Sequence, residues 1–241
     1  MSIRNNYKHT LTASYFGYIT QAIVNNFAPL LFVTFQRSFG VSLEKIAGLV
    51  TVNFCFQLII DLVSAKFIDR IGYRVAIVAA HFFAGAGLIM LGTLPFALPD
   101  PYIGLLISIG FYAVGGGLIE VLISPIVEAC PTDKKSAAMS LLHSFYCWGH
   151  VAVILLTTLF FVTAGIENWR VLAYLWAIIP FANAVYFCLV PINSLAAEGG
   201  ASPMKELFKS KLFWILAVLM VCSGASEQAM SQWSSAFARQ A

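Results

Sequence analysis

Glu120 is the residue of this sequence whose type and position most clearly suggest chemistry. It lies in Gly115-Gly116-Gly117-Leu118-Ile119-Glu120, inside an apolar run from Tyr102 to Cys130. An ionisable group at membrane depth costs roughly 2.5–3.5 kcal/mol on insertion scales, so it is kept out of lipid and faces other helices or a watery cavity. We therefore predict that Glu120 belongs to a functional site. The alternative is a protonated Glu120 that forms a packing hydrogen bond with a neighbouring helix.

Polar side chains recur at helical spacing in five apolar runs. Residues three or four positions apart share one face of a helix, so each series forms a stripe. Interhelical hydrogen bonds, worth about 0.6 kcal/mol each on average, explain one or two stripes, whereas five favour a shared polar cavity. The stripes are Tyr18, Gln21, Asn25 and Asn26; Asn53, Gln57 and Asp61; Gly116, Glu120 and Ser124; His143, Tyr146, Cys147 and His150; and Ser223, Glu227, Ser231 and Ser234.

The last apolar run also carries an aromatic residue that is a candidate for solute contact. Trp233 follows Glu227 and Gln228, but six residues of regular helix turn it about 120° away from Glu227. Gly224 is a plausible place for the helix to bend or unwind, which would let all three face one solute. The alternative for Trp233 is a place in the aromatic belt at the membrane interface.

The composition indicates an all-α membrane protein. Of the 241 residues, 60% are hydrophobic and 10% charged, whereas soluble domains carry about 25% charged residues. The apolar runs lack the period-2 alternation of barrel strands. The net charge of +3 is spread over connecting segments, so no nucleic-acid partner is predicted. The five cysteines are scattered without ligand-spaced histidines, so we expect no disulfide, metal or other cofactor.

Seven apolar runs are long enough to cross a bilayer, which takes about 20 residues. We divide the chain into a six-span bundle over 1–192, a cytoplasmic central loop over 193–211 and a seventh span within 212–241. The runs lie near 11–35, 46–68, 75–98, 102–129, 138–163, 170–190 and 212–237. The third and sixth are nearly free of polar stripes, with only His81 and Asn183 inside them.

The basic residues predict the orientation. Of the 14 lysines and arginines, ten fall on the side of the N-terminus and four on the other side. Cytoplasmic loops carry the excess of basic residues, so we predict a multi-pass protein with a cytoplasmic N-terminus. The ten are Arg4, Lys8, Lys66, Arg70, Arg74, Lys134, Lys135, Lys205, Lys209 and Lys211; the four are Arg37, Lys45, Arg170 and Arg239.

The segment between the second and third spans resembles the cytoplasmic-loop signature of the major facilitator superfamily, Gly-x-x-x-Asp-Arg/Lys-x-Gly-Arg/Lys-Arg/Lys. The charged groups of this motif can bind a helix terminus and release it when the bundle rocks. The alternative is a surface turn whose charges only set the membrane orientation. Asp69, Arg70, Gly72 and Arg74 match the signature, while Ala65 and Tyr73 depart from it.

Three further stretches resemble the fucose-permease branch of sugar:proton symporters in that superfamily. They are Asn25-Asn26 with Phe35-Gln36-Arg37-Ser38-Phe39, Gly117-Leu118-Ile119-Glu120 with Ser124-Pro125, and Leu142-His143-Ser144-Phe145-Tyr146-Cys147-Trp148-Gly149. The resemblance implies that Glu120 gains and loses a proton and that His143 and Tyr146 line the sugar site. The chain departs from the branch at Pro29, which replaces an Asp, and at Ser124, which replaces an Asn. Asp61 or Glu227 would then have to supply a second carboxylate.

The predicted fold is the six-helix N-terminal bundle of the major facilitator fold plus a seventh span. The superfamily fold has twelve spans in two halves, each built of inverted 3+3 repeats, with the substrate between them. We expect either an incomplete chain or one that a complementary chain completes. The candidate substrate-binding residues are Asn25, Asn26, Gln57, His143, Tyr146, Glu227, Gln228 and Trp233, with Glu120 for proton coupling.

The resemblance implies a proton-coupled transporter of a sugar or similar polyhydroxylated solute that works by alternating access in the cell membrane. Its partners would be the solute, protons and the lipid bilayer. The alternative is a drug or metabolite efflux antiporter of the same superfamily. An intramembrane enzyme would need a nucleophile and base in contact, and a helix face shared by His143, Cys147 and His150 does not aim the thiol at either imidazole.

Overall fold

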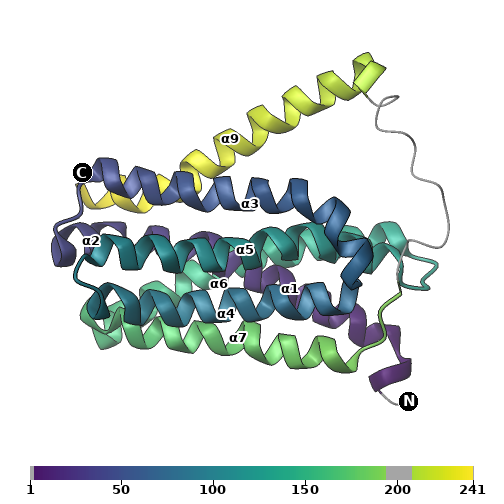
Figure 1. Cartoon of the computed structure of the whole chain (residues 1–241), viewed down its shortest axis with the longest axis horizontal. Helices are drawn as coiled ribbons and strands as arrows, with labels where there is room; N and C mark the ends of the chain where they lie inside the picture. The colour runs from purple at the N-terminus through teal and green to yellow at the C-terminus, as the bar shows by residue number, and fades with distance from the viewer. Residues whose placement is uncertain (1–2, 194–207, 241) are drawn as a thin grey trace.

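Long helices account for the regular secondary structure of the described residues (Figure 1). The computed structural model describes residues 3–193 and 208–240, without the side chains of Ala65, Lys66, Asp69, Arg239 and Gln240. Seven helical segments in these ranges are long and apolar enough to cross a membrane. The predicted all-helical membrane fold is therefore confirmed. Most of the predicted central loop, 193–211, lies outside the described residues.

The first span, Tyr7–Phe39, is broken, which its apolar pattern does not reveal. It consists of α1 (Tyr7–Asn26), the 3-10 turn η2 (Ala28–Leu31) and α2 (Phe32–Phe39). The break falls at Pro29, because proline has no N–H to donate to the preceding turn.

The remaining spans are continuous helices. They are α3 (Leu43–Ile71), α4 (Tyr73–Ala97), α5 (Pro101–Glu128), α6 (Lys135–Ala164), α7 (Trp169–Leu189) and α9 (Lys211–Gln240). The 3-10 turns η1 (Ile3–Asn5) and η3 (Ile166–Asn168) precede α1 and α7.

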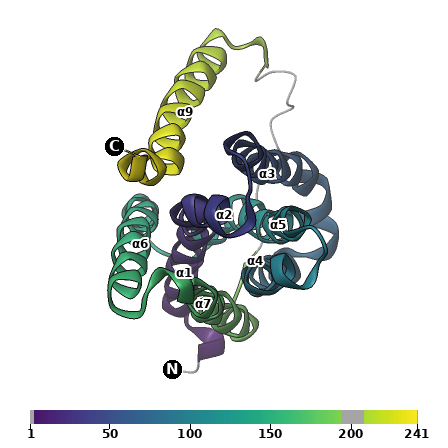
Figure 2. The same cartoon turned by 90° about the vertical axis from the view of Figure 1, so that its left-hand side faces the viewer.

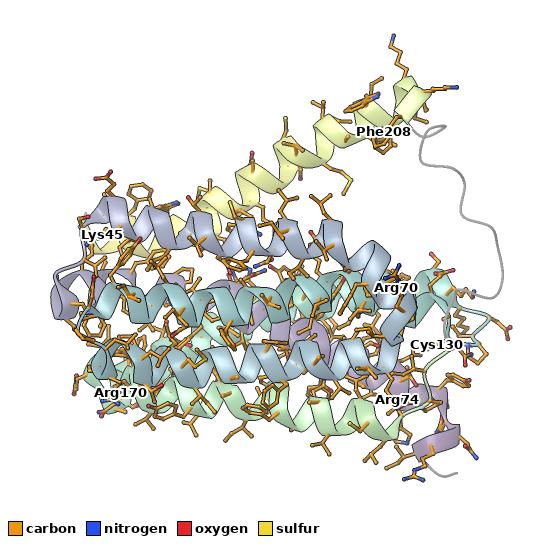
Figure 3. The ribbon with its side chains drawn as sticks, in the orientation of Figure 1. Lys45, Arg70, Arg74, Cys130, Arg170 and Phe208 are labelled. Atoms are coloured by element: carbon orange, nitrogen blue, oxygen red, sulfur yellow. The ribbon has the colours of Figure 1, made fainter. Side chains whose placement is uncertain are left out.

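The connections between spans gather at two opposite ends of the bundle. Arg70, Arg74 and Cys130 lie at one end, here called the Arg70 end, whereas Lys45 and Arg170 lie at the other, the Arg170 end (Figure 3). The N-terminus lies at the Arg70 end (Figure 1). Of the basic residues that predict the orientation, Arg70 and Arg74 are therefore separated from Lys45 and Arg170 by the length of the bundle. Which end faces the cytoplasm stays a prediction.

Helix α1 occupies the centre of the bundle (Figure 2). It packs against α4, α5, α6 and α7, and the first span has the most buried side chains of the seven. Helix α3 packs on the outside of α5. A shift in the position of α1 would therefore act directly on α4, α5, α6 and α7.

The two isolated polar side chains of the third and sixth spans meet in the core. Asn183 of α7 and His81 of α4 are both buried, and Asn183 Nδ2 lies 2.9 Å from His81 Nε2. Asn183 also donates to the carbonyl of Ala13 in α1 at 3.0 Å. His81 Nδ1 lies 2.8 Å from the carbonyl of Ile77, so a neutral ring that donates there accepts from Asn183 through Nε2. This cluster ties α4 and α7 to α1.

Glycines permit the close approach of α4 and α5. A Cβ atom at Gly115 would lie 2.5 Å from the backbone nitrogen of Ala84, and one at Gly87 would lie 2.5 Å from that of Tyr112. Small residues allow helix backbones to meet at such distances within a membrane. This interface therefore depends on the absence of a side chain at both positions.

Gly115→Ala should lower the thermal unfolding temperature of the purified protein in detergent. The added methyl group meets the α4 backbone, and such overpacking typically costs about 1–3 kcal/mol. Gly110→Ala is a matched control on the same helix, because its Cβ would meet only the Phe56 ring at 3.6 Å. Equal unfolding temperatures of the two variants would contradict this account of the interface.

Cysteine labelling tests the orientation. In a variant whose five native cysteines are replaced by serine, a membrane-impermeant thiol reagent added outside intact cells should label Asp100→Cys but not Lys134→Cys. Asp100 caps the start of α5 beside Tyr102, whose hydroxyl donates to the Lys45 carbonyl at the Arg170 end, whereas Lys134 caps α6 near the Arg70 end. Labelling of Lys134→Cys alone would reverse the predicted orientation.

Candidate functional site

A cavity of about 640 Å³ lies between α1, α3, α5, α6 and α9. Its volume falls within the roughly 300–1,000 Å³ of small-ligand pockets. The five helices around the cavity are those whose polar stripes predict one. Helices α4 and α7 contribute no lining residue. The lining residues are Tyr18, Gln21, Asn25, Phe54, Gln57, Leu58, Asp61, Glu120, His143, Tyr146, Cys147, Met220, Gly224, Glu227 and Gln228.

Two carboxyl groups share this cavity. Glu120 projects into it from α5, and its Oε2 accepts a hydrogen bond from Gln21 Nε2 at 3.3 Å. Asp61 reaches the same cavity from α3, and its Oδ1 is buried without a hydrogen-bond partner among the described residues. Carboxyl groups inside a membrane are costly and mark ion or substrate pathways.

Buried amides form another part of the wall. Gln57 Nε2 donates to Asn25 Oδ1 at 3.1 Å and to Asn53 Oδ1 at 3.2 Å. All three side chains are buried, and the bond between Gln57 and Asn25 joins α3 to α1. The amides of Asn25 and Gln57 are therefore held in place where a solute would meet them.

Aromatic rings also line the cavity. The ring centroid of Tyr18 lies 5.6 Å from that of His143 and 6.2 Å from that of Tyr146. The Tyr18 hydroxyl lies 3.1 Å from Ser124 Oγ, which fixes the ring against α5. The cavity thus offers flat apolar faces beside hydrogen-bonding amides and carboxyl groups.

Helix α9 is attached to the bundle near the break in the first span. Gln232 Nε2 donates to the carbonyl of Asn25 at 2.9 Å. In a regular helix that carbonyl would accept from residue 29, but Pro29 has no N–H. Ser235 donates to the Pro29 carbonyl at 3.0 Å, and Ser231 donates to Asn26 Oδ1 at 2.8 Å. The break thus provides an acceptor to which α9 binds.

The attached part of α9 lies near the Arg170 end, and the rest of the helix diverges from the bundle toward the other end (Figure 1). The cavity-lining residues of α9, from Met220 to Gln228, precede the attached segment. The contacts of residues 231–235 therefore bound the cavity on one side.

The structure brings together seven of the predicted site residues and leaves two outside the cavity. Asn26 and Trp233 do not line it. Asn26 donates Nδ2 to the Ala22 carbonyl at 2.8 Å and accepts from Ser231, so its amide joins helices instead. The seven in the cavity are Asn25, Gln57, Glu120, His143, Tyr146, Glu227 and Gln228.

Trp233 lies away from Glu227 and Gln228 because α9 stays helical. Its ring centroid lies 5.9 Å from that of Phe32 in α2, next to the attached segment of α9. Helix α9 continues through Gly224, so the unwinding considered for that position does not occur.

Sequence reasoning gave no role to Tyr18 and Gln21, which lie in a polar stripe, and none to Gln232, which lies four residues after Gln228. Helical spacing identifies the face on which a side chain lies but not its partner on another helix. The bond of Gln232 to the Asn25 carbonyl is therefore found only in the structure.

The loop motif is only partly described. Gly72 ends α3 and precedes α4 with a φ of 83°, a left-handed conformation that favours glycine. Arg74 Nη1 donates to the carbonyls of Phe187 at 2.8 Å and Cys188 at 3.1 Å, at the C-terminal end of α7. Basic groups are favourable at that end of a helix.

The gating role predicted for the motif stays a prediction. The contact of Arg74 lies within the six-span bundle, and Arg70 is exposed. The side chain of Asp69 lies outside the described residues.

Comparison with known protein families gives one match. The model described as Major Facilitator Superfamily matches residues 14–241. This range contains every cavity-lining residue and the loop motif. No match was found among curated proteins.

A disulfide tests the attachment of α9. Asn26→Cys combined with Ser231→Cys, in a variant whose other cysteines are serine, should cross-link on mild oxidation because the two native side chains bond at 2.8 Å. With a protease site inserted into 193–211, the two cleaved pieces should stay together on a non-reducing gel. Asn26→Cys with Val218→Cys is the control, since Val218 is exposed and lies more than three turns from Ser231. Equal cross-linking of both pairs would contradict the attachment.

Proposed function

The chain belongs to the Major Facilitator Superfamily, whose members are membrane transporters, and on this premise we propose that it carries a sugar or similar polyhydroxylated solute together with protons. The observation that supports the proposal best is the polar cavity, in which Glu120 lies beside amides and aromatic rings. The resemblance of three stretches to sugar:proton symporters supports the same substrate class.

The cavity has the groups that a sugar requires. Hydroxyl groups need matched donors and acceptors, which Asn25, Gln57 and Gln228 provide, and a sugar ring needs a flat apolar surface, which Tyr18 and Tyr146 provide. A site that bonds hydroxyls rejects analogues that lack them, because its own polar groups would then be unpaired. This is the proposed source of selectivity.

Glu120 is the proposed proton carrier. Its carboxyl group faces the cavity, so water that enters from an open side can deliver or remove a proton. When the cavity closes, the ionised form becomes costly at membrane depth and the protonated form is favoured. Solute and proton would therefore move together. Asp61 is the proposed second carboxyl group, because it lies on α3, which packs against the helix that carries Glu120.

Alternating access is the proposed mechanism. The attachment of α9 near Pro29 bounds one side of the cavity. With the predicted orientation, the attached segment lies toward the outside of the cell. Breaking the contacts of Ser231, Gln232 and Ser235 would open the Arg170 end. We propose that a second half of the fold, in the same reading frame or on a partner chain, supplies the remaining wall.

Glu120→Gln should abolish accumulation of solute driven by a pH gradient while retaining solute exchange at equal pH, because glutamine keeps the shape and polarity but carries no exchangeable proton. The measurement is uptake and counterflow in liposomes that contain the complete transporter. Glu44→Gln is the matched control, since Glu44 is an exposed carboxylate in the first turn of α3, outside the cavity. Accumulation that persists in Glu120→Gln would refute the coupling.

An efflux antiporter of drugs or metabolites is the second candidate. Phe54, Leu58 and Met220 give the cavity an apolar side that suits lipophilic solutes. Thermal stabilisation of the purified protein distinguishes the two classes. Monosaccharides should raise the unfolding temperature if the proposal holds, whereas stabilisation by lipophilic cations alone would favour efflux.

A further inference from the structure

Gln21 is the direct partner of Glu120. It lies on α1 one turn before Asn25, only 3% of its surface is exposed, and its Nε2 is 3.3 Å from Glu120 Oε2. The other atom of the amide, Oε1, is buried and has no hydrogen-bond partner among the described residues. A buried amide with one end bonded and one end unpaired is unusual, because buried polar atoms nearly always have partners.

The amide of Gln21 has room beside Glu120 because residue 116 has no side chain. A Cβ atom at Gly116 would lie 3.0 Å from Gln21 Oε1. Val24 lies on the same side, also 3.0 Å from that Cβ position. Oε1 has no hydrogen-bond partner on this side among the described residues, so it is not held there.

An amide can serve both proton states of a carboxyl group. Its Nε2, which lies 3.3 Å from Glu120 Oε2, donates to the carboxylate when Glu120 is ionised. After half a turn of the terminal bond, Oε1 takes the same place and accepts from a protonated carboxyl group. The two ends of the amide are almost equal in size, so the exchange needs no other movement.

We propose that Gln21 is the positioning residue of Glu120, which it holds in one place by donating to the ionised form and accepting from the protonated form. This inference rests on the proposed proton role of Glu120. Gln21 exchanges no proton itself: the proton passes between cavity water and the Glu120 carboxylate, and only the amide rotates. The carboxyl group thereby keeps a partner throughout the transport cycle.

The donor role is the stronger of the two. A hydrogen bond to an ionised group is stronger than one between neutral groups. Gln21 therefore favours the ionised form of Glu120, and its loss should move proton binding to higher pH.

Other titratable groups line the same cavity as Glu120. They are Tyr18 on α1, Asp61 on α3, His143, Tyr146 and Cys147 on α6, and Glu227 on α9. Their charges affect the pH at which Glu120 binds its proton. The test therefore compares variants that keep all six groups.

Infrared difference spectroscopy of the purified protein tests the inference. The band of a protonated carboxyl group should appear as the pH falls, and its absence in Glu120→Gln assigns it to Glu120. In Gln21→Met the midpoint should rise by about one pH unit, the difference expected between a charge-assisted and a neutral hydrogen bond. The carboxyl stretch should also move to higher frequency, because the protonated group loses its acceptor. A residue with only a packing role would change neither.

Two further variants complete the test. Gln21→Asn keeps the amide but shortens the side chain by one methylene, so it should shift the midpoint as Gln21→Met does. Gln36→Met is the matched control, since Gln36 belongs to α2 of the same span and does not line the cavity. An unchanged midpoint and frequency in both Gln21 variants would overturn the inference while leaving the role of Glu120 intact. Absence of a Glu120 band in the unsubstituted protein would overturn the proposed proton role as well.

Discussion

The arrangement of the spans depends on one constraint: polar atoms carried into a membrane must find partners within the protein, because lipid offers none. Three contacts show how the chain meets it. Asn183 joins α7 to His81 of α4 and to α1, Gln57 joins α3 to Asn25 of α1, and Gln232 joins α9 to the Asn25 carbonyl. All three connect a surrounding helix to α1. The central position of α1 and the orientation of the polar stripes therefore have the same cause.

The break in the first span links the fold to the cavity. Pro29 removes the partner of the Asn25 carbonyl, and the freed oxygen becomes the point to which α9 attaches. Asn25 thus uses its backbone for the attachment and its side chain for the cavity wall. A movement of α9 that breaks the bond between Gln232 and the Asn25 carbonyl would act directly on Asn25, which also bonds Gln57. Asn25 therefore contacts both the attached segment of α9 and the wall of the cavity.

Two adjacent glycines of α5 have different effects on the two sides of this helix. On one side, Gly115 allows α4 to pack without space between the backbones. On the other, Gly116 leaves room for the amide of Gln21 beside Glu120. Neighbouring glycines thus serve a rigid interface and an adaptable hydrogen bond. The carboxyl group of Glu120 is presented to the cavity from a helix that is firmly held on its far side.

The sequence by itself determined the membrane class, the seven spans, the five helices that line a cavity and most of the residues in it, because length, apolar composition and helical spacing are local properties. It did not determine which residues meet across helices. Trp233 and Asn26 have suitable types and spacing, yet both contact neighbouring helices outside the cavity, whereas Gln21 and Gln232 find partners nearly a hundred or more positions away. The spacing of residues along the sequence determines which face of a helix each side chain occupies. The rotation of two helices and the distance between them depend on packing along their whole lengths, so only the tertiary structure decides which residues meet.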